Sequence, residues 1–257
     1  MIPTHLKLKI ENLRCMLSII IPTLNEEDYL SKLLESIRKQ NFRDYEIIVA
    51  DARSNDKTLE IARNYGCQII PGGLPAKGRN EGAKASQGEL LLFLDADVIL
   101  PKDFFKRTLE EFKKRSLDIA SFRLVPLPRN NFSLLFMNIF YNKPITLLEN
   151  VLPHAAVGIL ARKVMFDKLG GFDENVKLAE DHYLARRGQK TTNAKCGIIR
   201  STQIFVSDRR FRKDGWLKTG FKYLLCELHL IFIGPVRSDI FRYRFNHYKD
   251  EKIESRK

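Results

Sequence analysis

Two carboxylates that stand two residues apart follow a short apolar segment. Asp95 and Asp97 come directly after the five apolar residues 90–94. Where such a strand leaves a sheet, both side chains can face a hard divalent cation and a sugar-phosphate ligand. An Asp-x-Asp pair also occurs in solvated turns, so the pair by itself leaves both interpretations open.

A second acidic pair, Glu180 and Asp181, follows a Gly-Gly-Phe-Asp stretch at 170–173. One positioned carboxylate can accept the proton of an attacking hydroxyl group. The alternative is an ordinary helix N-terminus, where acidic residues are favoured by the helix dipole. We expect the neighbouring His182 to point away from the side of the helix that carries Asp181. His154 either lines an acceptor pocket or is a partly buried structural histidine.

A basic cluster formed by Arg209, Arg210, Arg212 and Lys213 follows the apolar residues 204–206. This cluster is either a solvated loop or a lid that closes on a diphosphate. Arginine suits the second role because its guanidinium group binds phosphate oxygens in pairs. In the lid interpretation, Arg209 and Arg210 bind the donor diphosphate.

Strand-like and helix-like segments alternate through the first half of the chain, which predicts a mostly parallel sheet flanked by helices. The expected strands are 17–21, 46–51, 67–70, 90–94 and 117–124. Asn25 is expected to cap the first helix, Ser54 or Asn55 to open the second, and Gly66 to end it. A helix rich in small residues follows near 78–86, where glycine suits close backbone packing. This arrangement puts Asp51 and Asp97 at the strand ends where such sheets bind ligands.

Composition limits the class of protein. The 257 residues are 44% hydrophobic and 29% charged, which excludes wholesale disorder. Lys and Arg outnumber Asp and Glu by 44 to 31, so the surface attracts anions such as phosphates or anionic lipids. The four cysteines form no CxxC pair and favour a reducing compartment. We recognise neither a signal peptide nor an apolar run long enough to span a bilayer.

Six stretches together resemble the inverting family 2 glycosyltransferases of the GT-A fold, over about residues 16–187. They are SIIIPTLNEE at 18–27, VADARSNDKT at 49–58, GRNEG at 78–82, LDAD at 94–97, GGFD at 170–173 and AEDH at 179–182. The resemblance implies a Rossmann-like α/β fold. We expect a helical extension to follow it at the C-terminus.

The same resemblance implies a donor site at the beginning of the chain. Pro22, Thr23 and Glu26 should border the nucleotide pocket. Asp51 should form a hydrogen bond to the base, and Arg79 should lie near the base and the phosphates.

The remaining matches imply metal binding and catalysis. Asp95 should contact the ribose or a metal-bound diphosphate, so we count it with the donor and with the metal. Asp97 should ligate Mg²⁺ or Mn²⁺, and Asp181 should be the general base. A single base with no protein nucleophile implies inversion at the anomeric carbon.

The expected activity is metal-dependent transfer of a sugar from a UDP- or GDP-sugar to a hydroxyl group on a lipid-linked or cell-surface glycan. One alternative is transfer to a polyprenyl phosphate, an acceptor that is already an anion and needs no base. Another is a non-catalytic protein that binds nucleotide-sugars. The charge of +13 also suggests nucleic acid, but no recognisable motif supports it, so no nucleic-acid partner is expected.

Four regions are expected: an N-terminal extension (1–15), a nucleotide-sugar-binding half (16–125), an acceptor-binding and catalytic half (126–207) and a basic, aromatic C-terminal region (208–257). In the last, residues 216–233 place apolar side chains near one helical face beside Lys218 and Lys222, and basic and aromatic residues continue after Pro235. This pattern suits an anionic membrane surface. The alternative is a helix packed on the catalytic domain. We expect a cytoplasmic protein that binds the cytoplasmic membrane face peripherally.

Overall fold

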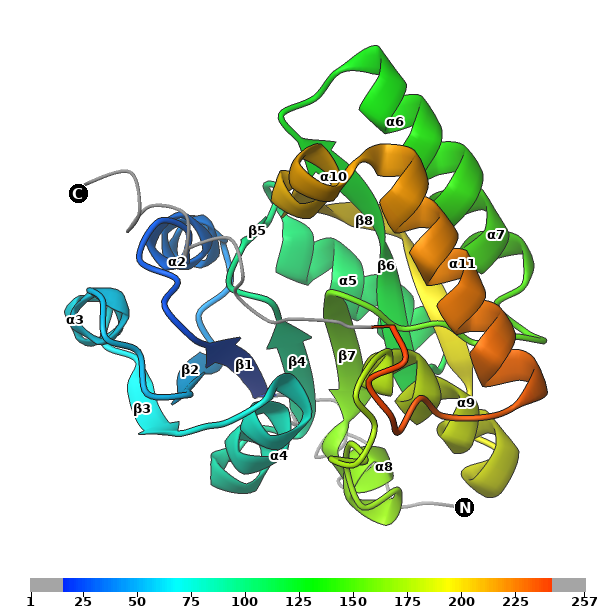
Figure 1. The fold of residues 1–257 in the computed structure, drawn as a ribbon. Helices are drawn as coiled ribbons and strands as arrows, with labels where there is room; N and C mark the ends of the chain where they lie inside the picture. The colour runs from blue at the N-terminus through cyan, green and yellow to red at the C-terminus, as the bar shows by residue number, and fades with distance from the viewer. Residues whose placement is uncertain (1–15, 242–257) are drawn as a thin grey trace, which may run out of the picture.

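Eight strands join into one sheet in the computed structural model, which describes residues 16–241 (Figure 1). Along the sheet their order is β3-β2-β1-β4-β7-β6-β8-β5. The strands are β1 (Leu17–Thr23), β2 (Tyr45–Asp51), β3 (Gln68–Pro71), β4 (Leu90–Leu94), β5 (Val98–Ile99), β6 (Ile119–Leu127), β7 (Gly158–Arg162) and β8 (Cys196–Ser207).

Helices cover both faces of this sheet. They are α2 (Leu30–Arg38), α3 (Thr58–Asn64), α4 (Pro75–Ala85), α5 (Phe104–Lys114), α6 (Asn131–Met137), the π-helical turn η1 (Asn138–Asn142), α7 (Lys143–Leu147), α8 (Lys163–Lys168), α9 (Glu180–Thr192), α10 (Arg209–Asp214) and α11 (Trp216–Phe232). Apolar residues of α2, α3 and α5 pack on one face, and those of α4, α8 and α9 pack on the other. Because strand residues alternate between faces, β1 and β4 contribute to both cores.

The first four strands are parallel, as the sequence predicts, with β1 between β2 and β4. Beyond β4 the sheet is mixed, because β7 runs antiparallel to both β4 and β6. The helices α6 and α7 separate β6 from β7 in the chain without crossing the sheet. The chain therefore re-enters at the end of the sheet that it left, and β7 must run in the opposite direction.

The expected starts of the first two helices are wrong. The helix α2 begins at Leu30, and Asn25 has a left-handed backbone with φ of 54°. The side chain of Asn25 accepts a hydrogen bond from the backbone N–H of Asn55 at 2.8 Å. Ser54 also forms no cap, because its hydroxyl accepts a bond from the backbone of Asn25. These polar groups tie the loops after β1 and β2 together instead of capping a helix. The expected helix end at Gly66 is confirmed, with φ of +71°.

Two glycines bring α4 very close to β1. A β-carbon on Gly82 would lie 2.3 Å from Cγ2 of Ile20, and one on Gly78 would lie 3.2 Å from Cβ of Pro22. The expected close packing of the small-residue helix is therefore confirmed. It buries Arg79, which lies between these two glycines in the sequence.

The chain after α11 folds back onto the segment that precedes α9. Val236 is buried, forms an isolated bridge with Leu178 and accepts a hydrogen bond from the N–H of Lys177 at 2.7 Å. Residue 236 itself therefore packs on the domain, while the predicted membrane binding of the C-terminal region stays a prediction. The N-terminal extension (1–15) and the basic and aromatic residues from Arg242 onward lie outside the described residues. Between residues 16 and 241, no helix has the length and apolarity needed to cross a bilayer.

Candidate active site

A cavity of about 1250 Å³ opens beside the carboxyl ends of β1 and β4. This is the edge at which open α/β sheets bind ligands. One wall comes from the end of β1, the loops after β1 and β4, α4, the start of α9 and α10. This mostly polar wall includes Pro22, Thr23, Glu26, Arg79, Asp95, Asp97, Glu180, Asp181, Arg209 and Arg210. Its apolar wall comes from α6 to α7 and from α11, and it includes Phe136, Met137, Phe140, Ile145, Leu148, Leu217, Phe221, Leu224, Leu228 and Ile231.

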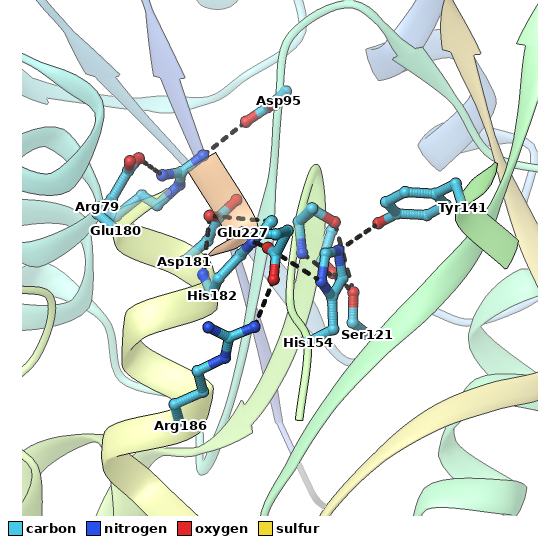
Figure 2. Close-up of polar contacts among 12 residues, drawn as sticks. Arg79, Asp95, Ser121, Tyr141, His154, Glu180, Asp181, His182, Arg186 and Glu227 are labelled. Atoms are coloured by element: carbon cyan, nitrogen blue, oxygen red, sulfur yellow. Dashed lines mark hydrogen bonds and ion pairs between the residues drawn. The ribbon is translucent and has the colours of Figure 1, made fainter. Parts of the chain in front are cut away.

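Arg79 joins the two acidic motifs of the sequence (Figure 2). Its Nη2 donates to Oδ1 of Asp95 at 2.8 Å, and its Nη1 donates to Oε1 of Glu180 at 2.6 Å. Burial opposes the charge on Arg79, but the neighbouring carboxylates outweigh it and raise the pKa of the guanidinium group. Glu180 is therefore not simply an acid at a helix start, since it is held by a partner from α4.

Asp97 lies beside Arg209, from the beginning of α10. The Nε of Arg209 is 3.3 Å from Oδ2 of Asp97, and its Nη2 is 3.0 Å from Oε1 of Glu26. The same guanidinium group lies over the ring of Tyr29, 4.6 Å from its centroid. Burial raises the pKa of Asp97 to about 7, although Arg209 acts in the opposite direction. The basic cluster therefore begins as a helix that contacts the acidic motif, not as a solvated loop, and Arg210 lines the cavity beside it.

The Asp-x-Asp pair offers the chemistry that a magnesium or manganese ion requires. Asp95 and Asp97 both line the cavity and offer only carboxylate oxygens, which these ions prefer. Such ions take one or two carboxylates and complete their shell with substrate phosphates and water. The burial that raises the pKa of Asp97 also makes a nearby cation favourable. The residues present therefore fit Mg²⁺ or Mn²⁺ held jointly with a diphosphate.

Asp51 organises the loop at the end of β2. Its Oδ1 accepts hydrogen bonds from the hydroxyls of Thr23 at 2.9 Å and Ser54 at 2.6 Å, and its Oδ2 accepts from the N–H of Ser54 at 2.8 Å. Its neighbours Ala52 and Arg53 line the cavity, as do Pro22 and Thr23. The predicted contact between Asp51 and a nucleotide base stays a prediction.

Asp181 lies in the first turn of α9, where the chain enters the helix through Ala179 with a left-handed φ of 60°. The carboxylate accepts a hydrogen bond from the backbone N–H of His182 at 2.8 Å. Burial raises the pKa of Asp181 to about 6, while His182 and Arg79 favour the charged form. A carboxylate with that pKa is mostly ionised near pH 7 and can still accept a proton, as a general base must.

The side chain of His182 does not point away from Asp181, contrary to the sequence-based expectation. Its Nε2 is 3.7 Å from Oδ1 of Asp181, and its Nδ1 forms a hydrogen bond with Oε1 of Glu227 (Figure 2). Arg186 donates to the other oxygen of Glu227. Sequence reasoning missed Glu227, although it is the one acid in the otherwise apolar and basic sequence 216–232. A lone acid in an apolar helix was the available signal.

His154 lines the cavity on the other side of Glu227. Its Nε2 lies 3.2 Å from the hydroxyl of Tyr141, and its ring centroid is 3.8 Å from that of His182. Burial lowers the pKa of His154 well below its usual range, so this imidazole is neutral. His154 is thus a partly buried histidine in the wall of the cavity, and its contact with an acceptor stays a prediction.

Comparison with known proteins agrees with the family resemblance seen in the sequence. Residues 18–168, more than half of the chain, match the family model of Glycosyl transferase family 2. Poly(ribitol-phosphate) beta-N-acetylglucosaminyltransferase TarS of Staphylococcus aureus is 36% identical over 99 residues, which are 35% of this chain and 17% of TarS. The uncharacterized glycosyltransferase EpsJ of Bacillus subtilis is 28% identical over 185 residues, 65% of this chain and 54% of EpsJ.

Two solved structures share the fold. A crystal structure of an S. aureus TarS fragment with UDP-GlcNAc has a TM-score of 0.59 and 23% identity, covering 75% of this chain and 58% of that one. The mannosyltransferase PcManGT from Pyrobaculum calidifontis, in complex with GDP-Man and Mn²⁺, has a TM-score of 0.62 and 18% identity, covering 83% and 65%. At these identities the likeness establishes the GT-A-type fold, which confirms the predicted fold class.

Proposed function

Because the chain belongs to glycosyl transferase family 2, we propose that it transfers a sugar from a UDP- or GDP-sugar to an acceptor hydroxyl, with inversion at the anomeric carbon. The observation that carries this proposal is the position of Asp181. Its largely buried carboxylate lines the same cavity as Asp95 and Asp97, and Arg79 forms ion pairs with both Asp95 and Glu180, the neighbour of Asp181. A base and a pair of carboxylates that can hold a cation against a diphosphate, sharing one cavity, are what glycosyl transfer from a nucleoside diphosphate requires.

In this mechanism, Asp181 accepts the proton of the acceptor hydroxyl as its oxygen bonds to the anomeric carbon. The bond between that carbon and the diphosphate breaks on the opposite face, and the nucleoside diphosphate leaves with the electron pair. Burial favours neutralisation of Asp181, so proton uptake is favourable as the reaction proceeds. No second carboxylate is needed as a nucleophile, which is consistent with inversion.

The departing diphosphate needs positive charge near the end of β4. Arg209 and Arg210 line this part of the cavity and can neutralise it. A divalent cation held by Asp95 and Asp97 would supply additional electrostatic stabilisation of the leaving group when bound. Pro22, Thr23 and Glu26 would border the nucleotide, with Asp51 supporting their loop and, in our proposal, reaching the base. Arg79 would act near the phosphates by orienting Asp95.

The apolar wall of the cavity favours an acceptor with a lipid portion. It is formed by residues 136–148 and by α11, whereas the polar wall holds the acidic motifs. This division supports the assignment of residues 16–125 to donor binding and of residues 126–207 to acceptor binding and catalysis, with the C-terminal region adding one wall. A lipid-linked glycan would place its hydrocarbon against the apolar side chains and its hydroxyl at Asp181.

A nucleotide screen by thermal unfolding tests the donor assignment. We expect UDP or GDP, at about 100 times its Kd and with Mn²⁺ present, to stabilise the protein by about 2.7 kcal/mol, or about 5–10 °C in Tm. CDP and dTDP serve as matched diphosphate controls, and each nucleotide is repeated with EDTA. Unchanged Tm values with all four nucleotides would contradict a nucleotide-sugar donor.

Peripheral membrane binding is a second expected result, since apolar side chains of α11 remain exposed. Phe232 and Ile233 are 79% and 77% exposed and do not line the cavity. We expect the protein to sediment with vesicles that contain anionic lipid at low salt and less so at high salt. A Phe232→Ser/Ile233→Ser variant should lose most of this binding.

The matched control is Val164→Ser, because Val164 is 81% exposed on α8. It should sediment like the unchanged protein. Equal sedimentation of both variants, or a supernatant that keeps all protein at low salt, would contradict a membrane-binding role for α11.

A further inference from the structure

Glu227 lies on α11, outside the motifs that define the site, yet it contacts the neighbour of the base. We propose that Glu227 is a positioning residue that acts on Asp181 through His182. Its Oε1 forms a hydrogen bond with Nδ1 of His182, whose Nε2 lies 3.7 Å from Oδ1 of Asp181 (Figure 2). The proposal rests on Asp181 being the base of the proposed reaction.

Two carboxylates beside its ring favour the protonated form of His182. Burial alone would lower the pKa of His182, but the charges of Asp181 and Glu227 outweigh burial and raise it. In the protonated form, the ring donates one N–H to Glu227 and turns the other toward Asp181. The adjacent His154 is neutral and contributes no competing charge. Glu227 therefore both fixes the orientation of the His182 ring and stabilises its positive charge.

The charge on His182 matters because the other groups around Asp181 largely oppose one another. Burial and the neighbouring Glu180 disfavour the Asp181 carboxylate, while Arg79 from α4 favours it less than His182 does. Arg79 is already paired with two carboxylates. Two further groups near the network are Tyr141 of η1 and Arg186 of α9. Without the His182 cation, the pKa of Asp181 should rise above about 6.

The position of Glu227 depends on how α11 is held. Arg186 of α9 donates to Oε2 of Glu227, so both carboxylate oxygens are engaged. The adjacent Cys226 and, one turn further on, Leu230 are buried. The chain after α11 is tied to Lys177 at the entry to α9. The C-terminal helix is thus part of the structure that sets the state of the base.

The pH dependence of kcat, measured with donor and metal saturating, tests this proposal. In the unchanged protein the rate should fall below about pH 6, where Asp181 becomes protonated. In Glu227→Gln this acid limb should move upward by about one pH unit, so that the rate at pH 5.5 falls about tenfold relative to the unchanged protein. At pH 8.5 the two rates should be similar, and KM for the donor should be unchanged.

His182→Asn should shift the acid limb in the same way, and the double variant should shift it no further, since both changes remove one interaction. The matched control is Glu111→Gln, on α5, which removes a carboxylate paired with Arg115. This control should change Tm without shifting the acid limb of the pH dependence of kcat. If Glu227→Gln does not fold, His182→Asn carries the test.

A rate lowered equally at every pH, with the limb in place, would overturn the proposal and leave Glu227 a structural role. One zinc ion bound per chain and lost in Glu227→Gln would also overturn it, because a metal-bound His182 cannot hold the proton. Failure of the proposed role of Asp181 as the base would give a different result from failure of the role of Glu227. In that case the unchanged protein would show no acid limb and Asp181→Asn would keep its rate.

Discussion

Replacing Asp181 with asparagine should lower turnover by about 10²–10⁴-fold, the usual contribution of a positioned general base. Asparagine has nearly the same shape and can still accept the hydrogen bond from the N–H of His182. It cannot take a proton from the acceptor hydroxyl. Because the carboxylate is buried and partly destabilised, its removal should not unfold the protein.

The measurement is kcat for glycosyl transfer, with nucleotide affinity determined in parallel by thermal shift. Nucleotide binding should be unchanged, since in the proposed mechanism Asp181 contacts the acceptor hydroxyl and not the nucleotide. The matched control is Asp167→Asn on the exposed side of α8, which should keep full turnover. An unchanged rate in Asp181→Asn would indicate an acceptor that is already an anion, such as a polyprenyl phosphate. Loss of nucleotide binding with unchanged kcat would contradict the role of base.

Replacing Asp97 with asparagine should lower turnover by about 100-fold, equivalent to about 2.7 kcal/mol of lost leaving-group stabilisation. The substitution removes the charge of a largely buried carboxylate that faces the cavity. The fold should remain, because Arg209 keeps its ion pair with Glu26. The loss should therefore appear as a loss of metal dependence and not as a loss of stability.

The measurement compares nucleotide-induced thermal shifts with and without Mn²⁺. In the unchanged protein Mn²⁺ should increase the shift, and in Asp97→Asn that increase should disappear. Asp118→Asn is a matched control, because Asp118 is also partly buried and lies 3.5 Å from Arg162, away from the cavity. A wild-type rate and an undiminished effect of Mn²⁺ in Asp97→Asn would remove the metal assignment.

Much of the fold was predictable because its first half is built from local patterns. Continuous apolar segments that end in carboxylates predict buried parallel strands, and β4 was predicted to the residue. Parallel neighbours end at one edge, which is why Asp51 and Asp97 could be assigned to the same side of the sheet. Glycines at 78 and 82 likewise predicted close packing, because a β-carbon at either place would meet β1.

Helix starts were not predictable in the same way. Asn25 and Ser54 have the side chains of capping residues. Here, however, the side chain of Asn25 forms a hydrogen bond with the loop after β2, and the side chain of Ser54 forms one with the loop after β1. A capping preference is a local signal, and these contacts join residues that are far apart in the chain. The antiparallel direction of β7 was unpredictable for a similar reason, since the residues of a strand do not indicate whether it runs parallel or antiparallel to its neighbours.

The sequence by itself determined the family, the succession of the first strands along the chain and the acids that can do chemistry, because each depends on residue type and short spacing. Only the tertiary structure decided which charges meet. It pairs Arg79 with Asp95 and Glu180, and it brings Glu227 of α11 to His182 of α9. Such pairings depend on how separate elements pack, and buried charges need partners wherever the chain supplies them. The environment that raises the pKa of Asp181 to about 6 is therefore a property of the folded chain, not of its Glu-Asp motif.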